Sequence, residues 1–317
     1  MPSPLLPQNP MSQPDPKTDA VRLLRELTEA HGVPGAEDAV RRIFLRELAG
    51  HGTVHTDRLG SAAVEREDSG PRVLVAGHFD EVGFAVQHIT AKGFLKLVAL
   101  GGWWTHTLVA QRVRILTKSG QEVLGVIGST PPHFLGESAK DKVLPLEQLY
   151  VDVGAGSRTE VEALGISLGD AVAPDSAFTA LAGGERFLAK AFDNRCGVEA
   201  AVQTMQLLKN ESLPCQLIAA GSVQEEVGCR GAVTLAALTK PDVALVMEDD
   251  VVFHANFRAA LDAGAASTMR AGSRPVRAAL PIQPISGSDL RASDGSNSRT
   301  QAWVFCFPDC MAVLAGW

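Results

Sequence analysis

The 317-residue chain contains no run of 18 consecutive apolar residues and no cluster of Lys or Arg. The first absence excludes a membrane-spanning helix in this sequence. The second argues against a surface for nucleic acid or anionic lipid, because such surfaces need a basic stripe. A net charge of -7 and 45% hydrophobic residues are typical of a soluble globular protein. The composition therefore predicts a small molecule or peptide as the partner, with no nucleic acid and no membrane.

Cysteines are few, and no secretion signal is visible. The five cysteines form an odd set without CxxC spacing, so neither a disulfide framework nor a zinc ribbon is indicated. The N-terminus lacks the basic region and the continuous apolar stretch of a signal peptide. Residues 1–17, rich in Pro, Ser and Gln, are predicted to be a disordered tail. A reducing cytoplasmic location fits these features.

Two short helices and a β-rich stretch are predicted in the first half of the chain. Helical spacing of apolar residues indicates one helix from Thr18 to Gly32 and another beginning at Glu37. A strand-like run covers Val73 to Ala76. From about residue 84 to 175, short β-branched segments alternate with glycines, which predicts a small β-barrel or sandwich.

The second half of the chain changes to an α/β rhythm. A helix is predicted from about Cys196, followed by strands at Leu217–Val223 and Val243–Met247. This alternation predicts a mostly parallel sheet flanked by helices. The fold expected is therefore an α/β catalytic domain, formed by residues 18–83 and 176–317, with an inserted β-barrel-like domain at residues 84–175.

Three of the predicted buried strands end in side chains that can bind metal. His78 follows the first, the pair Glu225-Glu226 follows the second and Glu248 follows the third, while Asp193 lies just before a helix. In open α/β sheets, ligands bind at the carboxyl ends of the strands. One imidazole with several carboxylates suits Zn²⁺, Co²⁺ or Mn²⁺.

Each of these residues also has a structural interpretation. A lone histidine such as His78 is often a satisfied structural residue, and Asp193 could be a helix N-cap. Glu225 and Glu226 are harder to explain in that way. Adjacent carboxylates after a buried strand repel one another and lose hydration unless a cation neutralises them.

Three sequence blocks connect these residues to a known family. GHFDEVGF (77–84), AKAFDNRCG (189–197) and SVQEEVGCRGA (222–232) resemble the signature blocks of the family-42 metallo-aminopeptidases. These are the TET-type glutamyl, leucyl and lysyl aminopeptidases, some of which are labelled endoglucanase or cellulase M. Further segments, among them GGWWTHTLVAQRV (101–113) and DVGAGSRTEVEALGISLGD (152–170), follow in the family's order. The resemblance covers roughly residues 18–250.

The resemblance implies two divalent metal ions, Zn or Co, that share one carboxylate. His78 matches the ligand of one ion, and Glu248 matches the position where the family uses Asp or Glu. Asp193 matches the carboxylate that bridges both ions, and Glu226 matches a ligand of the other ion.

The resemblance also implies the reaction and the assembly. Glu225 matches the general base of a metal-assisted peptide hydrolysis, and Asp80 matches the acidic residue that orients His78. The inserted β domain matches the family's dimerisation domain, which implies self-association into a dimer and, in many members, a dodecamer.

The C-terminal region departs from the family pattern. All eight histidines lie at or before His254, so the family's last histidine ligand is not matched. Residues 249–317 contain no Glu and no Lys and show little helical or alternating periodicity, which suggests a region read from a shifted frame or decaying without selection.

Several readings of the function therefore stay open. With only Asp193 and Glu226 as protein ligands, the second metal site is expected to be weak or empty. The leading alternative is accordingly a catalytically impaired or inactive relative. A carboxypeptidase or deacylase using the same site is a further alternative. A cellulase fits least, because glycosidases use two carboxylic acids and no metal.

Overall fold

A six-stranded sheet forms the larger part of the protein. The structure, a computed structural model, describes residues 16–134, 142–184, 186–247 and 301–304. The strands lie in the order β1 (Thr53–Thr56), β2 (Ala62–Glu65), β12 (Gln216–Ser222), β3 (Arg72–His78), β13 (Val243–Val246) and β14 (Gln301–Val304). The neighbours from β12 to β14 pair in parallel, while β1 and β2 form an antiparallel edge. The mostly parallel sheet predicted from the sequence is confirmed.

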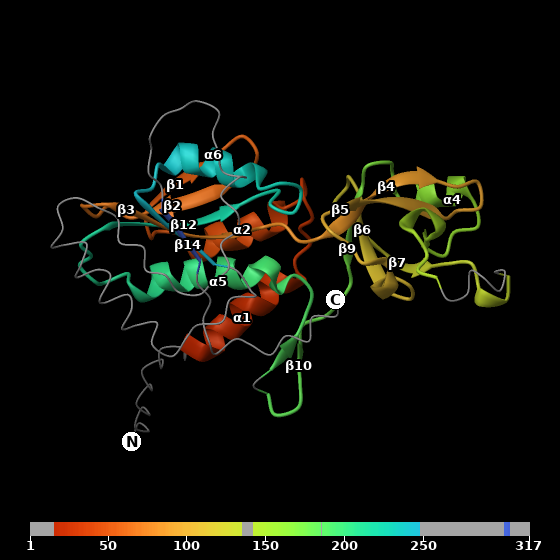
Figure 1. Ribbon diagram of the computed structural model, residues 1–317, viewed down its shortest axis with the longest axis horizontal. Coiled ribbons are helices and arrows are strands. Elements are labelled where there is room, and N and C mark those ends of the chain that lie inside the picture. Colours follow the sequence, from red (N-terminus) through yellow and green to blue (C-terminus); the bar gives the residue numbers. More distant parts are fainter. Residues whose placement is uncertain (1–15, 135–141, 185, 248–300, 305–317) are drawn as a thin grey trace, which may run out of the picture.

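Helices cover both faces of this sheet (Figure 1). Helices α1 (Pro16–Glu29), α2 (Asp38–Glu47) and α5 (Phe192–Leu207) lie on one face, and α6 (Arg230–Thr239) lies on the other. Alternation along the strands produces the two cores, because successive side chains of a strand point to opposite faces. In β3, Val75 packs in the α1/α2/α5 core, whereas Leu74 packs with Leu235 of α6.

Two helix starts differ slightly from the sequence expectation. Helix α1 begins at Pro16 rather than Thr18, since proline fits the first helical position, where its missing N–H has no helical partner. Helix α5 is assigned from Phe192, but Asp193 and Asn194 have non-helical dihedral angles. The regular helix therefore starts close to the predicted position, and the predicted N-terminal tail up to residue 15 lies outside the described residues.

The smaller part of the protein is a closed barrel. Its strands run in the order β4 (Gly83–Ile89), β5 (Leu95–Leu100), β8 (Tyr150–Asp152), β7 (Glu122–Gly128), β6 (Arg112–Leu116) and β9 (Ala171–Pro174). A short helix, α4 (Arg158–Ala163), begins where the Ser157 side chain accepts a hydrogen bond from the Glu160 N–H. The predicted β-barrel is confirmed, and Figure 1 shows it beside the α/β part.

Short elements complete the described chain. They are the 3-10 helices η1 (Thr105–Thr107), η2 (Pro132–Phe134) and η3 (Leu146–Gln148) and the hairpin of β10 (Thr179–Ala180) with β11 (Phe187–Leu188). Within the described ranges, no helix is long and apolar enough to cross a membrane.

The C-terminal region is described only in part. Glu248 and nearly all of the segment 249–317 lie outside the described residues. Within that segment the sequence shows little helical or alternating periodicity. The structure describes one strand there, β14, which pairs in parallel with β13. A four-residue strand is too short to produce a clear period in the sequence.

Candidate active site

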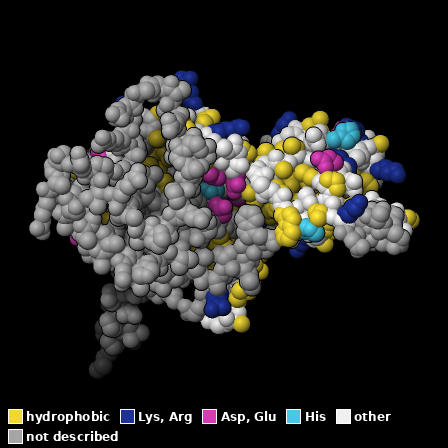
Figure 2. All heavy atoms as spheres, in the orientation of Figure 1, with side chains coloured by type: hydrophobic (Ala, Val, Ile, Leu, Met, Phe, Trp, Pro, Cys, Tyr) yellow, Lys and Arg dark blue, Asp and Glu magenta, His cyan; other side chains and the backbone are white. Residues whose placement is uncertain are grey.

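The carboxyl ends of β3 and β12 bring the predicted residues to one edge of the sheet. His78 is the last residue of β3 and lies opposite Ser222, the last residue of β12. Glu225 and Glu226 follow in the turn after β12. Figure 2 shows acidic side chains gathered around a histidine near the middle of one face, close to the barrel.

His78 is buried, and both of its ring nitrogens face acceptors. Its Nε2 lies 2.9 Å from Asp193 Oδ1 and 3.9 Å from Glu225 Oε2. Its Nδ1 lies 3.0 Å from the Asp80 carbonyl oxygen and 3.4 Å from Asp80 Oδ1. Burial disfavours the charged ring, but hydrogen bonds to Asp193 and Asp80 outweigh it and raise the pKa of His78. The Nε2 side of the ring therefore faces concentrated negative charge.

Asp80 ties the histidine to the glutamate pair. Its Oδ1 accepts a hydrogen bond from the Glu225 N–H and its Oδ2 one from the Glu226 N–H, each at 3.0 Å. Burial raises the pKa of Asp80, yet its contacts with His78 and these two N–H groups lower it on balance. The sequence predicted only a contact with His78. The structure adds that Asp80 fixes the backbone of both glutamates.

The turn that carries the glutamate pair is held from two further sides. Gln224 has a φ of 55°, and its N–H donates to Glu37 Oε1 at 3.1 Å. At the other end, the Cys229 thiol donates to Glu225 Oε1 at 3.1 Å. The two carboxylates are thereby presented from a fixed turn rather than from a free loop.

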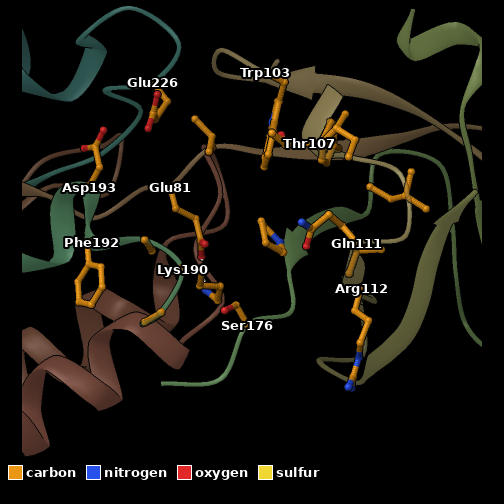
Figure 3. A pocket seen from close by; sticks show the side chains of 18 of the residues that line it. Glu81, Trp103, Thr107, Gln111, Arg112, Ser176, Lys190, Phe192, Asp193 and Glu226 are labelled. Carbon is orange, nitrogen blue, oxygen red and sulfur yellow. Dashed lines mark hydrogen bonds and ion pairs between the residues drawn. The ribbon is translucent and has the colours of Figure 1, made fainter. Parts of the chain in front are cut away.

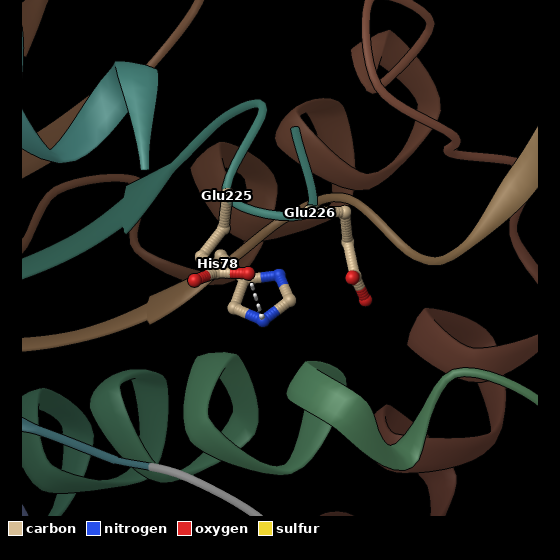
Figure 4. A group of neighbouring side chains, drawn as sticks. All are labelled: His78, Glu225 and Glu226. Atoms are coloured by element: carbon tan, nitrogen blue, oxygen red, sulfur yellow. Dashed lines mark ion pairs between the residues drawn. The ribbon is translucent and has the colours of Figure 1, made fainter. Parts of the chain in front are cut away.

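His78, Glu225 and Glu226 form a group with the spacing of a metal site. One ligand atom from each residue lies within 4.8 Å of the others. Glu225 and Glu226 reach toward His78 from two sides (Figure 4). Burial, followed by the charge of Asp193, raises the pKa of Glu226 to about 7. A bound cation would relieve this repulsion, so the donor set fits a divalent ion.

Asp193 reaches the same edge from the start of α5. The neighbouring Asn194 is fully buried and donates from Nδ2 to the Met247 carbonyl oxygen at 2.5 Å, while its Oδ1 accepts from the Gly197 N–H at 2.9 Å. These bonds fasten the start of α5 to the end of β13. The Asp193 carboxylate itself is 45% exposed and can therefore face both His78 and a ligand from solvent.

A buried ion cluster lies beside the site and was not predicted from the sequence. Glu81 Oε1 lies 2.6 Å from Lys190 Nζ and 3.4 Å from Arg195 Nη2. Arg195 is fully buried and also donates to the carbonyl oxygens of Leu27 and Gly32. Burial lowers the pKa of Lys190. The cluster joins the end of α1 to the segments that carry His78 and Asp193.

Five of the six predicted site residues are thus described at one place. His78, Asp193, Glu225 and Glu226 share the sheet edge, and Asp80 lies directly beneath them. Glu248, the remaining predicted ligand, lies outside the described residues. Its neighbour Met247 is described, and the Met247 N–H bonds to the Ala76 carbonyl oxygen of β3.

Comparisons with known proteins place the chain in one family. The model of the family described as M42 glutamyl aminopeptidase matches residues 60–272. A lysyl aminopeptidase of Pyrococcus furiosus is 35% identical over 237 residues, which are 73% of this chain and 66% of that protein. The chain spans 64% to 66% of the length of three curated relatives that it matches.

Solved structures give the same result at the level of the fold. A TET aminopeptidase from a marine-sediment thaumarchaeon has a TM-score of 0.71 and 37% identity, covering 74% of this chain and 67% of that one. TET1 of Pyrococcus horikoshii, which assembles into a tetrahedron or a large octahedral shell, has a TM-score of 0.67 and 30% identity, covering 74% and 72%. Since the family model matches most of the sequence, including His78, Asp80, Asp193, Glu225 and Glu226, the chain belongs to the M42 glutamyl aminopeptidase family.

Proposed function

We propose that this protein is a metal-dependent aminopeptidase that removes N-terminal residues from peptides. The observation that carries the proposal is that the proposed ligands His78 and Glu226 and the proposed base Glu225 have side-chain atoms within 4.8 Å of one another, with Asp193 on His78 Nε2. Family membership supports the same activity.

The metal ions of the proposal are two divalent ions, zinc or cobalt. His78, Asp193 and Glu248 would hold one ion, and Asp193 and Glu226 would hold the other. Bound there, the ions would supply Lewis-acid polarisation of the scissile carbonyl and of the attacking water.

Glu225 is the proposed general base. Its carboxylate takes a proton from the attacking water and passes it to the leaving amine, a role that requires it to lie within reach of the reacting atoms. Oε1 of Glu225 is bonded to the Cys229 thiol, so Oε2 is the oxygen that faces His78 Nε2 and the reaction centre. Asp80 keeps Glu225 in this position through the backbone N–H.

A catalytically impaired relative is the second candidate, and one observation favours it. Among the residues that the structure describes, Asp193 and Glu226 are the protein ligands proposed for the second ion. A catalytic zinc ion normally has three. On this reading the protein binds one ion firmly and turns substrate over slowly or not at all.

The test is an assay of aminoacyl p-nitroanilides with added Co²⁺ or Zn²⁺. The proposal predicts turnover in the wild-type protein and a loss of about 10² to 10⁴-fold in Glu225→Gln, the usual contribution of a general base. Glu122→Gln, an exposed carboxylate of the barrel, is the matched control and keeps wild-type turnover. Absence of turnover with every substrate and both metals would leave the impaired relative as the function.

We also propose that the protein self-associates through the barrel. Apolar side chains project from it into solvent, among them Trp104, Val109, Leu124 and Val126, each more than 40% exposed. Exposed apolar side chains in this number are the kind of surface that a partner subunit can cover. Light scattering after gel filtration tests the proposal: Leu124→Asp is expected to lower the oligomer mass, and a monomeric wild-type protein would refute it.

A further inference from the structure

A pocket lies between the sheet edge and the barrel, directly beside the candidate active site. We call it the junction pocket. It has a volume of about 610 Å³, and both Glu226 and Asp193 line it. This volume is within the range of small-molecule and cofactor sites. Figure 3 shows the two carboxylates on one side, with Trp103, Gln111 and Arg112 of the barrel part across the space from them.

The walls of the junction pocket are largely apolar and aromatic. They include Phe84, Trp103, Leu108, Ile127, Phe187 and Phe192. The Trp103 ring stacks on Phe84 with ring centroids 4.7 Å apart, and its Nε1 donates to the Gly83 carbonyl oxygen at 3.0 Å. Because both contacts fix the indole ring, this wall is preformed.

The cationic side chains that line the pocket are already paired. Lys190 Nζ lies 2.6 Å from Glu81 Oε1, and Arg112 Nη2 lies 2.8 Å from Asp175 Oδ2. An acidic group entering the pocket would compete with these carboxylates. The lining therefore disfavours an acidic occupant, and its aromatic walls favour an apolar one.

A loop of the barrel connects the pocket with the carboxylates of the site. Gly101 has a φ of 88°, and a Cβ atom at this position would lie 3.2 Å from Glu226 Oε2 and 2.7 Å from Val82 Cγ1. A Cβ atom at Gly101 would therefore clash with Val82 and crowd Glu226, so the loop lies close to Glu226. The next residue, Gly102, lines the pocket, and a Cβ atom there would meet no atom within 4 Å.

The position of the general base decides which part of a substrate faces the pocket. Glu226 lines the pocket, whereas Glu225 does not, and the two side chains lie on either side of His78 (Figure 4). Glu225 gives its proton to the leaving amine, so the leaving peptide lies on the Glu225 side. The residue on the other side of the scissile bond, the N-terminal one, then lies toward Glu226.

We propose that the junction pocket receives the side chain of the substrate's N-terminal residue and selects apolar, preferably aromatic, side chains. This inference rests on the proposed aminopeptidase function. It makes Trp103 and the loop at Gly101 and Gly102 determinants of specificity contributed by the barrel part of the chain.

Gly102→Leu tests the inference by filling the pocket. Its Cβ atom has free space, so the variant adds volume without backbone strain. Gly156→Leu is the matched control, since Gly156 is exposed outside the pocket and its Cβ atom would make only ordinary contacts with Glu160. With Ala, Leu and Phe p-nitroanilides, the Phe to Ala ratio of kcat/KM is expected to fall at least about tenfold in Gly102→Leu, because packing of a side chain in an apolar pocket carries this much discrimination. The control is expected to keep the wild-type ratio.

Two results would overturn the inference. One is an unchanged Phe to Ala ratio in Gly102→Leu. The other is a change that follows the second residue of Ala-Xaa dipeptides instead, which would assign the pocket to the leaving peptide.

A wild-type protein that hydrolyses no substrate would refute the proposed function, and the pocket is then tested by binding. L-Phenylalaninamide should quench tryptophan fluorescence and bind Gly102→Leu at least about tenfold more weakly than the wild-type protein or Gly156→Leu. Equal affinities, or no binding to the wild-type protein, would refute the pocket assignment.

Discussion

The barrel and the sheet edge differ in what they bury. Barrel residues such as Phe84, Ile115 and Ile127 form a continuous apolar cluster. The sheet edge instead buries Asp80 and Arg195 with complete exclusion from solvent. Apolar burial stabilises a fold with little dependence on exact partners, whereas a buried charge is tolerated only with its partners in place. The comparison indicates that the barrel is a stable scaffold. At the sheet edge, the buried charged groups of the candidate active site lower the stability of the fold.

The largest effect should come from removing a buried cation at the edge. Arg195→Met leaves Glu81 with one cation fewer and removes the side-chain donor to the Leu27 carbonyl oxygen, so we expect a loss of about 3 to 5 kcal/mol in unfolding free energy. Arg114→Met removes a half-exposed barrel arginine and should cost less than about 1 kcal/mol. Urea denaturation of both variants measures the two losses of unfolding free energy. Equal losses would contradict the difference between the sheet edge and the barrel.

A buried carboxyl group in helix α5 should make the stability of the α/β part depend on pH. Burial, followed by the charge of Asp19, raises the pKa of Glu199 to about 8, and its Oε1 has no hydrogen-bond partner. The charged form is thus disfavoured in the folded state, and stability falls as pH rises from the unfolded pKa near 4.5 to about 8. One pKa unit corresponds to about 1.4 kcal/mol, so the full loss between pH 4.5 and pH 8 is on the order of 5 kcal/mol.

Glu199→Gln should remove this loss. The unfolding free energy of the variant, relative to that of the wild-type protein, should therefore be higher at pH 8.5 than at pH 5.5. Urea midpoints at the two pH values measure the gain. Glu162→Gln, which removes an exposed carboxylate from α4 of the barrel, separates this local effect from a general change of charge. A gain of the same size in both variants would contradict the assignment to Glu199.

Two nearly buried aspartates sharpen the comparison further. Asp80→Asn places an amide where two backbone N–H groups need acceptors, so the Glu225-Glu226 turn should shift. We expect kcat/KM to fall about 10- to 100-fold, as for other residues that position metal ligands. Asp175→Asn in the barrel weakens pairs to Arg112 and Arg114 and should leave kcat/KM for apolar substrates unchanged. Similar kinetic losses in both variants would contradict the division of roles.

The smallest effect is expected inside the barrel. Ile115→Val deletes one methylene group from the apolar cluster and should cost about 1 kcal/mol in unfolding free energy. The kinetic constants should stay at wild-type values, since Ile115 does not line the junction pocket. A change in kcat without a change in unfolding free energy would show that the barrel core takes part in the reaction.

Much of the fold was predictable because its signals are local. The apolar runs around Val73–Ala76 and Leu217–Val223 predicted strands β3 and β12, and the ends of these strands located His78 and the Glu225-Glu226 pair. A buried parallel strand produces such a run directly in the sequence. The adjacent carboxylates were informative for the same reason, since their repulsion follows from sequence neighbours alone.

The remaining features arise from contacts between distant segments. Glu81 and Arg195 are 114 positions apart in the sequence, and each lies inside a recognised motif with no sign of the other. The two hydrogen bonds accepted by Asp80 likewise cross 145 and 146 positions. The periodicity of a sequence predicts which residues are buried, but it does not identify the residues that they contact. The ion cluster and the junction pocket are therefore evident only in the folded chain.

The most direct test of the account is the amount of Zn²⁺ retained per chain after equilibrium dialysis, compared between the wild-type protein and Asp193→Ala. Asp193 is the carboxylate proposed to contact both ions, and it is nearly half exposed, so its truncation leaves the core intact. The account predicts at least one tightly retained ion in the wild-type protein and a large loss in Asp193→Ala. A wild-type protein that retains no ion, or equal retention by both proteins, would contradict a metal site at this edge of the sheet.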